Sequence, residues 1–339
     1  MLFNVFIFLS LLLGHGVNSR IIPISFIIFP LMLLSGLQLD VGTDYQSYLL
    51  RAETGNAHTF TRKYEYGFAI IIWLSNKLNY PQSIFLLSSF LQYTFLLIFC
   101  GRYLKYFNLR SGIIHILLIF ILLFYANIAA NQLNLLRFYI ALPIFGLFLL
   151  ELKKDRKFYR ICLLIALTSS FHLSFLFLSF LAIGLYFCQI TWRGAIALGV
   201  ATCFLWRFIL NYLSEIYHPL SRIDINVGIE MNIGPTDLPL IFTYLIITLM
   251  HSKEPTMFRP FVVLHFIMML FIFGPEAVSE RLSYVVYFLT VSLSLVVFRR
   301  GTPRIASQTQ IAIYAVWFLL PAYKFLIFND REYGFQWIL

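Results

Sequence analysis

Apolar segments recur along most of this chain, separated by short clusters of charged residues. Hydrophobic residues make up 60% of the sequence and charged residues 12%, whereas soluble domains are roughly half apolar and about a quarter charged. In lipid only helices and closed barrels satisfy the backbone, and uninterrupted apolar runs exclude the alternating strands of a barrel. The sequence therefore predicts an all-α, polytopic integral membrane protein. The segments that could enter the bilayer are residues 2–16, 21–37, 83–100, 112–130, 137–150, 161–171, 173–187, 195–210, 238–250, 258–274, 282–298 and 311–328.

Several of these segments are shorter than the ~20 residues that a helix needs to cross the hydrocarbon core. We expect them to be broken, tilted or re-entrant helices, and we expect residues 66–79 to dip into one face of the membrane. With these included, the sequence predicts about 10–13 membrane helices. They form a single membrane domain over residues 1–339. Residues 2–13 lack the basic start and small-residue exit of a signal peptide, so we expect an uncleaved first helix.

The excess of basic residues is concentrated in the loops that this interpretation places on one side of the membrane. The chain has 25 Lys and Arg against 15 Asp and Glu, and these loops hold 15 of the basic and three of the acidic residues. Basic residues collect in cytoplasmic loops, so this side is predicted to be cytoplasmic, and no nucleic-acid partner is needed to explain the charge. The basic loops lie around Arg20 and at residues 101–111, 151–160, 189–194, 251–259 and 299–304. The outer face then holds loops at about residues 38–66, 211–237 and 275–281.

The first outer loop carries polar side chains at helical spacing. If Thr43 caps a helix that begins at Asp44, then Asp44, Tyr48 and Arg51 share one face. A carboxylate, a phenol and a guanidinium would then point together at the membrane surface. The alternative is an ordinary interfacial loop, with its tyrosines in an aromatic belt and its charges in headgroup water.

Arg137 and His172 are polar residues in or beside apolar segments. Arg137 opens a helix that we expect to be bent by Pro143, at an outer end where cytoplasmic attraction does not explain a basic residue. It either snorkels to water or grips an anionic headgroup, because a guanidinium matches phosphate oxygens bidentately. His172 lies between two short apolar segments, so we expect the chain to break near it. A lone His is more often a satisfied core residue, but a break inside a membrane is tolerated only where it is buried in protein or lines a wet cavity, where His172 could exchange a proton.

Arg281 follows Glu276 and Glu280 and precedes Tyr284 at the start of a long outer-face helix. It either pairs locally with these acids, which contributes little, or forms a second phosphate clamp. Sharper motifs are absent, since the chain has no Walker loop, no HExxH, no GxSxG and no dinucleotide fingerprint. Its four cysteines have no paired spacing. We therefore expect neither a metal site nor a cofactor.

Five short motifs follow one another along the chain: Val41-Gly42-Thr43-Asp44-Tyr45 with Tyr48, then Glu65-Tyr66-Gly67-Phe68, Arg137 with Ala141, Phe171-His172-Leu173-Ser174, and Arg281-Leu282-Ser283-Tyr284. In this order they resemble the EpsG-like family of bacterial polysaccharide polymerases, relatives of the Wzy-type O-antigen polymerases. The resemblance spans about residues 40–287. Members often have glutamine after the helix-opening arginine, whereas this chain has Phe138, so only Arg137 keeps that match.

The resemblance implies a glycosyl transfer on the periplasmic face of a bacterial inner membrane. A growing chain would leave undecaprenyl pyrophosphate and be attacked by a hydroxyl of the incoming lipid-linked unit. Departure of the diphosphate needs fixed positive charge, for which Arg137, Arg281 and, less strongly, Arg51 are the candidates. Asp44 or His172 is the candidate base. The other substrate-binding candidates are Tyr45, Tyr48, Glu65 and Tyr284.

The partners that the resemblance implies are the undecaprenyl-pyrophosphate-linked oligosaccharide, membrane lipid and a chain-length regulator protein. Two other classes stay open. A flippase or transporter of lipid-linked oligosaccharide would show two comparable halves or inverted repeats, which the sequence does not display. An O-antigen ligase or membrane acyltransferase would share the outer-face site and differ in its product, a single transfer in place of a ladder.

Overall fold

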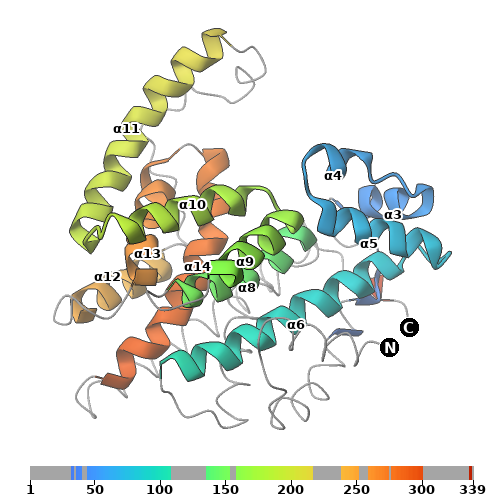
Figure 1. The fold of residues 1–339 in the computed structure, drawn as a ribbon, viewed down its shortest axis with the longest axis horizontal. Helices are drawn as coiled ribbons and strands as arrows, with labels where there is room; N and C mark the ends of the chain where they lie inside the picture. The colour runs from blue at the N-terminus through green and yellow to red at the C-terminus, as the bar shows by residue number, and fades with distance from the viewer. Residues whose placement is uncertain are drawn as a thin grey trace. The chain divides into compact units, whose positions relative to one another are not determined.

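The computed structural model describes residues 32–33, 36–39, 44–107, 135–152, 158–216, 238–251, 259–274, 276–300 and 336–337, with some side chains in these ranges left out. The described part is helical apart from one short strand pair, which confirms the all-α prediction (Figure 1). Strand β1 (Gln38–Leu39) pairs antiparallel with β2 (Gln336–Trp337). The segments expected at residues 2–16, 112–130 and 311–328 lie outside the described residues, as do most of residues 21–37.

Most of the described helices follow the apolar segments, and α3 and α4 lie outside them. They are α3 (Tyr45–Thr54), α4 (His58–Arg62), α5 (Tyr66–Lys77), α6 (Ser83–Tyr106), α8 (Leu136–Glu151), α9 (Phe158–Phe171), α10 (Ser174–Phe187), α11 (Trp192–Ile216), α12 (Leu238–His251), α13 (Arg259–Phe273) and α14 (Glu276–Arg300). The expected break near His172 is present, because α9 ends at Phe171 and α10 begins at Ser174.

Several segments that hydropathy marks as loops are helical in the structure. Residues 38–66 contain β1, α3 and α4, residues 211–216 belong to α11, and residues 276–281 form the start of α14. On the basic side, α6 continues past Gly101, and the Arg102 guanidinium forms a 3.1 Å ion pair with Glu151 at the end of α8. In α6, α11 and α14 a helix extends past its apolar core, because a helix end tolerates polar and charged residues. Helices α3 and α4 are separate polar helices, and α3 is the helix expected from Asp44.

The chain divides into two compact units, residues 1–180 with 321–339, and residues 181–320. In the first unit α8 packs against both α6 and α9. Its side chains from Phe138 to Glu151 are all buried, as expected for a helix that is apolar on every side. The short helices α3, α4 and α5 pack together, and α5 also contacts α6 and α9. In the second unit α13 packs against α11 and α14, and α12 packs against α14.

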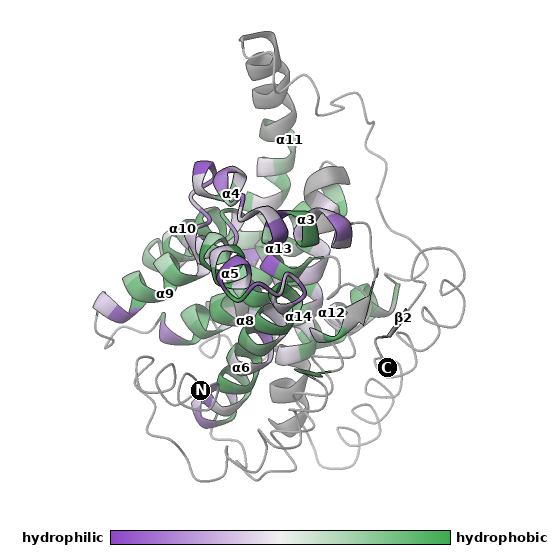
Figure 2. Cartoon of the chain, turned by 90° about the vertical axis from the view of Figure 1, so that its right-hand side faces the viewer, coloured by the Kyte–Doolittle hydropathy of each residue, from purple (hydrophilic) through white to green (hydrophobic). Residues whose placement is uncertain are grey.

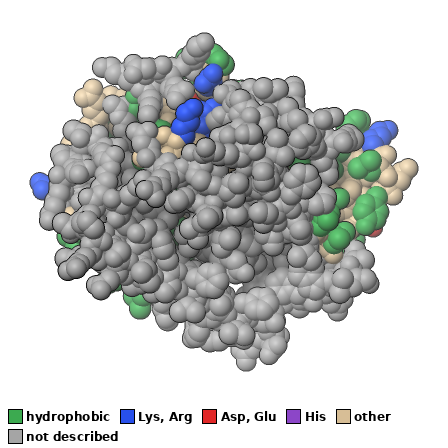
Figure 3. Space-filling model, turned by 90° about the horizontal axis from the view of Figure 1, so that it is seen from below, with side chains coloured by type: hydrophobic (Ala, Val, Ile, Leu, Met, Phe, Trp, Pro, Cys, Tyr) green, Lys and Arg blue, Asp and Glu red, His purple; other side chains and the backbone are tan. Residues whose placement is uncertain are grey.

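Large apolar side chains are exposed along helices of both units. On α12, Phe242, Leu245 and Leu249 are 50–69% exposed and share one face at i, i+3 and i+7. On α10, Phe177, Phe180 and Phe187 are 59–73% exposed. Such runs are rare on soluble monomers and mark contact with lipid or protein. Figure 2 shows apolar residues along most helices, with polar ones gathered on α3 and α4, and Figure 3 shows apolar side chains reaching one face of the molecule.

Within the described residues, α6 is the one helix long and apolar enough to cross a membrane by itself, and its apolar stretch is 78% buried inside the protein. Six other apolar helical stretches in this part have 10–17 residues. Two of these stretches belong to the 25-residue helices α11 and α14. The other four lie in α9, α10, α12 and α13, which have 14 or 15 residues and fit the expectation of short or broken membrane segments, since crossing takes ~20 residues.

Candidate functional site

A polar layer built from α3, α4 and α5 holds most of the predicted site residues of the first unit. Helix α3 starts one residue later than expected, with Asp44 at the N-cap, and ends at Gly55, whose φ of 64° is the left-handed conformation that glycine adopts readily. The side-chain amide of Asn76 on α5 donates to the carbonyls of Ala52 (3.2 Å) and Glu53 (2.9 Å). These bonds satisfy carbonyls at the end of α3 and fix it on α5.

Glu65 is the buried carboxylate of this layer, with 3% of its surface exposed. It occupies the N-cap of α5, but its side chain makes no capping bond to its own helix. Its Oε1 accepts a 3.2 Å hydrogen bond from the backbone N–H of Leu173, at the start of α10. N–H groups at a helix start lack partners within the helix and favour negative charge. Glu65 therefore stabilises the break between α9 and α10 from another part of the chain.

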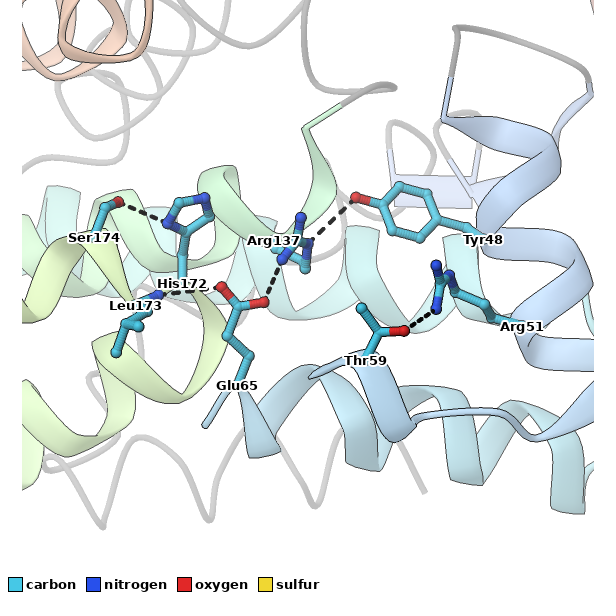
Figure 4. A network of polar contacts seen from close by, with 8 residues as sticks. All are labelled: Tyr48, Arg51, Thr59, Glu65, Arg137, His172, Leu173 and Ser174. Atoms are coloured by element: carbon cyan, nitrogen blue, oxygen red, sulfur yellow. Dashed lines mark hydrogen bonds and ion pairs between the residues drawn. The ribbon is translucent and has the colours of Figure 1, made fainter. Parts of the chain in front are cut away.

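Arg137 forms an ion pair with the second oxygen of Glu65 (Figure 4). Its Nη1 donates to Glu65 Oε2, and its Nε donates to the phenol oxygen of Tyr48 at 3.4 Å. Its side chain is 22% exposed, against 4% for that of Glu65. Among the described residues its Nη2 makes no hydrogen bond. Two of the three guanidinium nitrogens are thus held by different partners, and Nη2 has none among the described residues.

Tyr48 is buried, and burial raises the pKa of its phenol above the ordinary value, with Arg137 opposing this shift. The charge of Asp44 contributes a smaller rise. Tyr48 therefore stays neutral at physiological pH and serves as an acceptor for Arg137. Of the predicted grouping of Asp44, Tyr48 and Arg51, the charge of Asp44 acts on Tyr48. The phenol of Tyr48 contacts Arg137 on α8.

The ring of Phe60 on α4 contacts both Arg51 and Arg137. The Cζ of Arg137 is 4.8 Å from its ring centroid, and the Cζ of Arg51 is 5.1 Å from the same centroid. The two guanidinium carbons are therefore at most about 10 Å apart, the sum of those distances. Phe68 packs edge-on against Phe60 at 5.1 Å and lies 5.9 Å from Arg137. Cation–π attraction of this kind stabilises each contact by roughly 0.5–2 kcal/mol.

Arg51 has only neutral hydrogen-bond partners in the described part of the chain. Its Nη1 donates to Thr59 Oγ1 at 3.0 Å, and its Nε contacts Ser47 Oγ at 3.4 Å. Glu65 is thus the carboxylate in direct contact with this arginine pair, and it binds Arg137 alone. Arg51, Arg137 and Glu65 together have a net positive charge, and such a charge favours the binding of an anion.

His172 lies in the break and connects to the same layer through its neighbour Leu173. Its Nδ1 is 2.7 Å from Ser174 Oγ, and its ring meets that of Phe138 edge-on at 5.4 Å. Phe138, which departs from the family pattern, thus packs directly on the histidine. The ring of Phe175 also meets the His172 ring edge-on, with 6.1 Å between the centroids.

Three further predicted residues belong to other contacts or to the second unit. Tyr45 is 2% exposed, donates to Gln82 Oε1 at 2.8 Å and stacks on Phe85 at 4.6 Å, so it contacts α6 and not the arginines. Arg281 and Tyr284 belong to α14 in the second unit. The side chain of Arg281 lies outside the described residues.

Two residues that contact the arginines had no clear signal in the sequence. Phe60 and Thr59 lie in an unremarkable stretch, His58–Arg62, whose helix is only 5 residues long. A cation–π contact depends on which ring meets which arginine, and spacing along the chain does not encode that. Among the described residues no group of three His, Cys, Asp or Glu side chains is placed to hold a metal ion.

Comparison with known proteins agrees with the motifs. No curated protein and no solved structure is significantly similar to the chain. The exposed apolar side chains along the described helices indicate a membrane protein. The model of the EpsG family matches residues 21–338, nearly the whole length. The chain therefore belongs to the EpsG family.

Proposed function

We propose that the protein is a polysaccharide polymerase of the bacterial inner membrane, crossing it several times and using an undecaprenyl-pyrophosphate-linked donor. The bond from the sugar anomeric carbon to the diphosphate oxygen breaks, and the diphosphate keeps the electron pair. A new bond forms from that carbon to a hydroxyl oxygen of the incoming lipid-linked unit, whose proton passes to a base. Membrane lipid surrounds the enzyme, and a chain-length regulator is a further proposed partner.

The observation that carries this proposal is the way Arg137 is held. Tyr48 and Glu65 hold its Nε and Nη1, while Nη2 makes no hydrogen bond among the described residues and the side chain remains partly exposed. A positioned cation that does not have to reorganise stabilises a leaving group as its negative charge develops. Arg51, joined to Arg137 through Phe60, adds a second positive charge to the site.

Two residues remain proposed as the base, Asp44 and His172. His172 has the better-defined surroundings, since Ser174 and Phe138 fix its ring beside the Glu65 contact to Leu173. Imidazole exchanges protons near neutral pH. Arg281 and Tyr284 remain proposed substrate contacts.

The test is deletion of the gene, complementation with variants, and gel analysis of surface polysaccharide. Arg137→Ala should lose the ladder of long chains while a single repeat persists, and the transfer rate should fall on the order of 100-fold or more. Lys77→Ala removes one positive charge from the exposed end of α5 and should keep the ladder.

An unchanged ladder in Arg137→Ala, at equal protein level in the membrane, would refute the clamp. Loss of every repeat on deletion, including the single one, would instead identify a flippase or ligase.

A further inference from the structure

Tyr64 adopts a backbone conformation that tyrosine rarely takes. Its φ is 60°, in the left-handed region. It follows α4 in the arrangement that often ends helices, with Glu65 N donating to Phe60 O at 2.8 Å and Tyr64 N donating to Thr61 O at 3.1 Å. Glycine is the usual residue at this position. For a residue with a Cβ the left-handed conformation is less favourable by roughly 1–2 kcal/mol.

Packing does not offset this strain. The Tyr64 side chain is 67% exposed, and that of Tyr66 is 52% exposed. Their rings meet each other at 6.4 Å with planes inclined by 67°, so they form a corner and not a stack. Neither phenol makes a hydrogen bond with a described residue. Strained residues that gain little from their own surroundings concentrate at functional sites.

The location of the pair connects it to the arginine site. Tyr64 and Tyr66 flank Glu65, whose side chain points inward and forms the ion pair with Arg137. The Glu65 side chain is thus buried beside Arg137, whereas the side chains of Tyr64 and Tyr66 on either side of it are exposed. A ligand whose diphosphate lies at Arg137 carries its first sugars within reach of this corner.

We infer that Tyr64 and Tyr66 form a binding surface for a pyranose ring of the glycan next to the diphosphate. This inference rests on the proposed function. A pyranose presents apolar C–H groups on its face and hydroxyls on its rim. An exposed tyrosine offers the complement, a flat apolar ring with a polar tip. Tyrosine also gives large contact area at small loss of side-chain entropy.

The competing role is that of interfacial tyrosines in a membrane belt. A belt residue interacts with lipid headgroups, so it does not change affinity for a soluble sugar. A belt also gives no reason to keep tyrosine at a left-handed position, because a neighbouring residue of ordinary conformation would serve equally well.

The experiment uses the full-length protein in detergent and, as probe, the repeat-unit oligosaccharide released from its lipid by mild acid. Affinity is measured by calorimetry, and contact by saturation-transfer NMR from aromatic protons to sugar C–H groups. Tyr64→Ala and Tyr66→Ala should each weaken binding about tenfold, and Tyr→Phe by less, since the ring remains. Tyr80→Ala is the matched control, because Tyr80 is 48% exposed outside this segment.

Tyr64→Gly separates binding from folding. Glycine relieves the left-handed strain, so its thermal midpoint should rise while its affinity for the glycan falls. A purely structural role for Tyr64 would not lower affinity in a stabilised variant. Equal affinity in the wild type and both alanine variants, or no binding by the wild type, overturns the inference.

The outcome can be separated from that of the proposed function. Failure of glycan binding together with loss of the ladder in Arg137→Ala refutes the tyrosine site and leaves the polymerase proposal standing. Tyrosine-dependent glycan binding with an unchanged ladder on deletion supports the sugar site and refutes the polymerase.

Discussion

The Glu65 carboxylate joins parts of the first unit that lie far apart in the sequence. It binds Arg137, 72 positions away, and the N–H of Leu173, 108 positions away. Removing one partner of a buried ion pair leaves the other charge without compensation. The partial exposure of Arg137 reduces that penalty, because water reaches one side of the guanidinium.

Glu65→Ala should therefore lower the free energy of unfolding by about 1–3 kcal/mol, measured by denaturation of the purified protein in detergent. Glu65→Gln should lose less, since an amide oxygen can still accept from Leu173. Glu53→Ala is the control, because the Glu53 side chain is exposed on α3. Equal stability of Glu65→Ala and Glu53→Ala would show that the ion pair does not hold these helices together.

Helices α5 and α9 approach each other closely at Gly67. A Cβ placed there would lie 2.6 Å from Ser170 Oγ and 3.1 Å from both Ser170 O and Phe171 Cε1. The absence of a side chain lets the start of α5 reach the end of α9. This contact brings Glu65 to the break that follows Phe171.

Gly67→Ala should push α5 away from α9 and lower the free energy of unfolding by about 1–3 kcal/mol, as overpacking does. Adding Ser170→Ala removes the nearest contact and should recover part of the loss. Gly184→Ala on α10 is the control, because nothing lies within 4 Å of its added Cβ. There alanine should be neutral or stabilising by about 0.5–1 kcal/mol. Equal effects of the two alanine substitutions would contradict close packing at Gly67.

Membrane topology decides whether the arginine site can meet its proposed substrate. The charge distribution predicts that α3 faces the periplasm and that the start of α9 faces the cytoplasm. Glu53 and Tyr159 are exposed residues at these two places, with Tyr159 57% exposed.

In a background with the exposed Cys162 and Cys188 replaced by serine, a membrane-impermeant maleimide should label Glu53→Cys in intact spheroplasts. Tyr159→Cys should react only after the membrane is opened. Labelling of both sites from the same side, or in the reverse order, would contradict an outer-face site.

Much of the helical architecture was predictable from local pattern. Apolar runs predicted α6, α8, α9 and α10 to within a few residues at most ends, and the gap in apolar character predicted the break at His172. Hydropathy did not reveal α3, because that helix is polar and is held by Gly55 and by the Asn76 amide. Nor did it show that Arg102 and Glu151, assigned to separate loops, pair at adjacent helix ends.

For the site, the sequence by itself determined the chemical groups and the short motifs that contain them, among them Glu65, Arg137 and His172. It also determined the family, since the order of the motifs along the chain can be recognised without knowing which residues are in contact. Only the tertiary structure decided that Glu65 pairs with Arg137, that Tyr48 accepts from the same guanidinium across 89 positions, and that Phe60 contacts two arginines. The physical reason is range, since hydropathy and helical periodicity act over a few turns. These contacts depend instead on how closely separate helices pack, which Gly67 and the buried part of α8 from Phe138 onward control together.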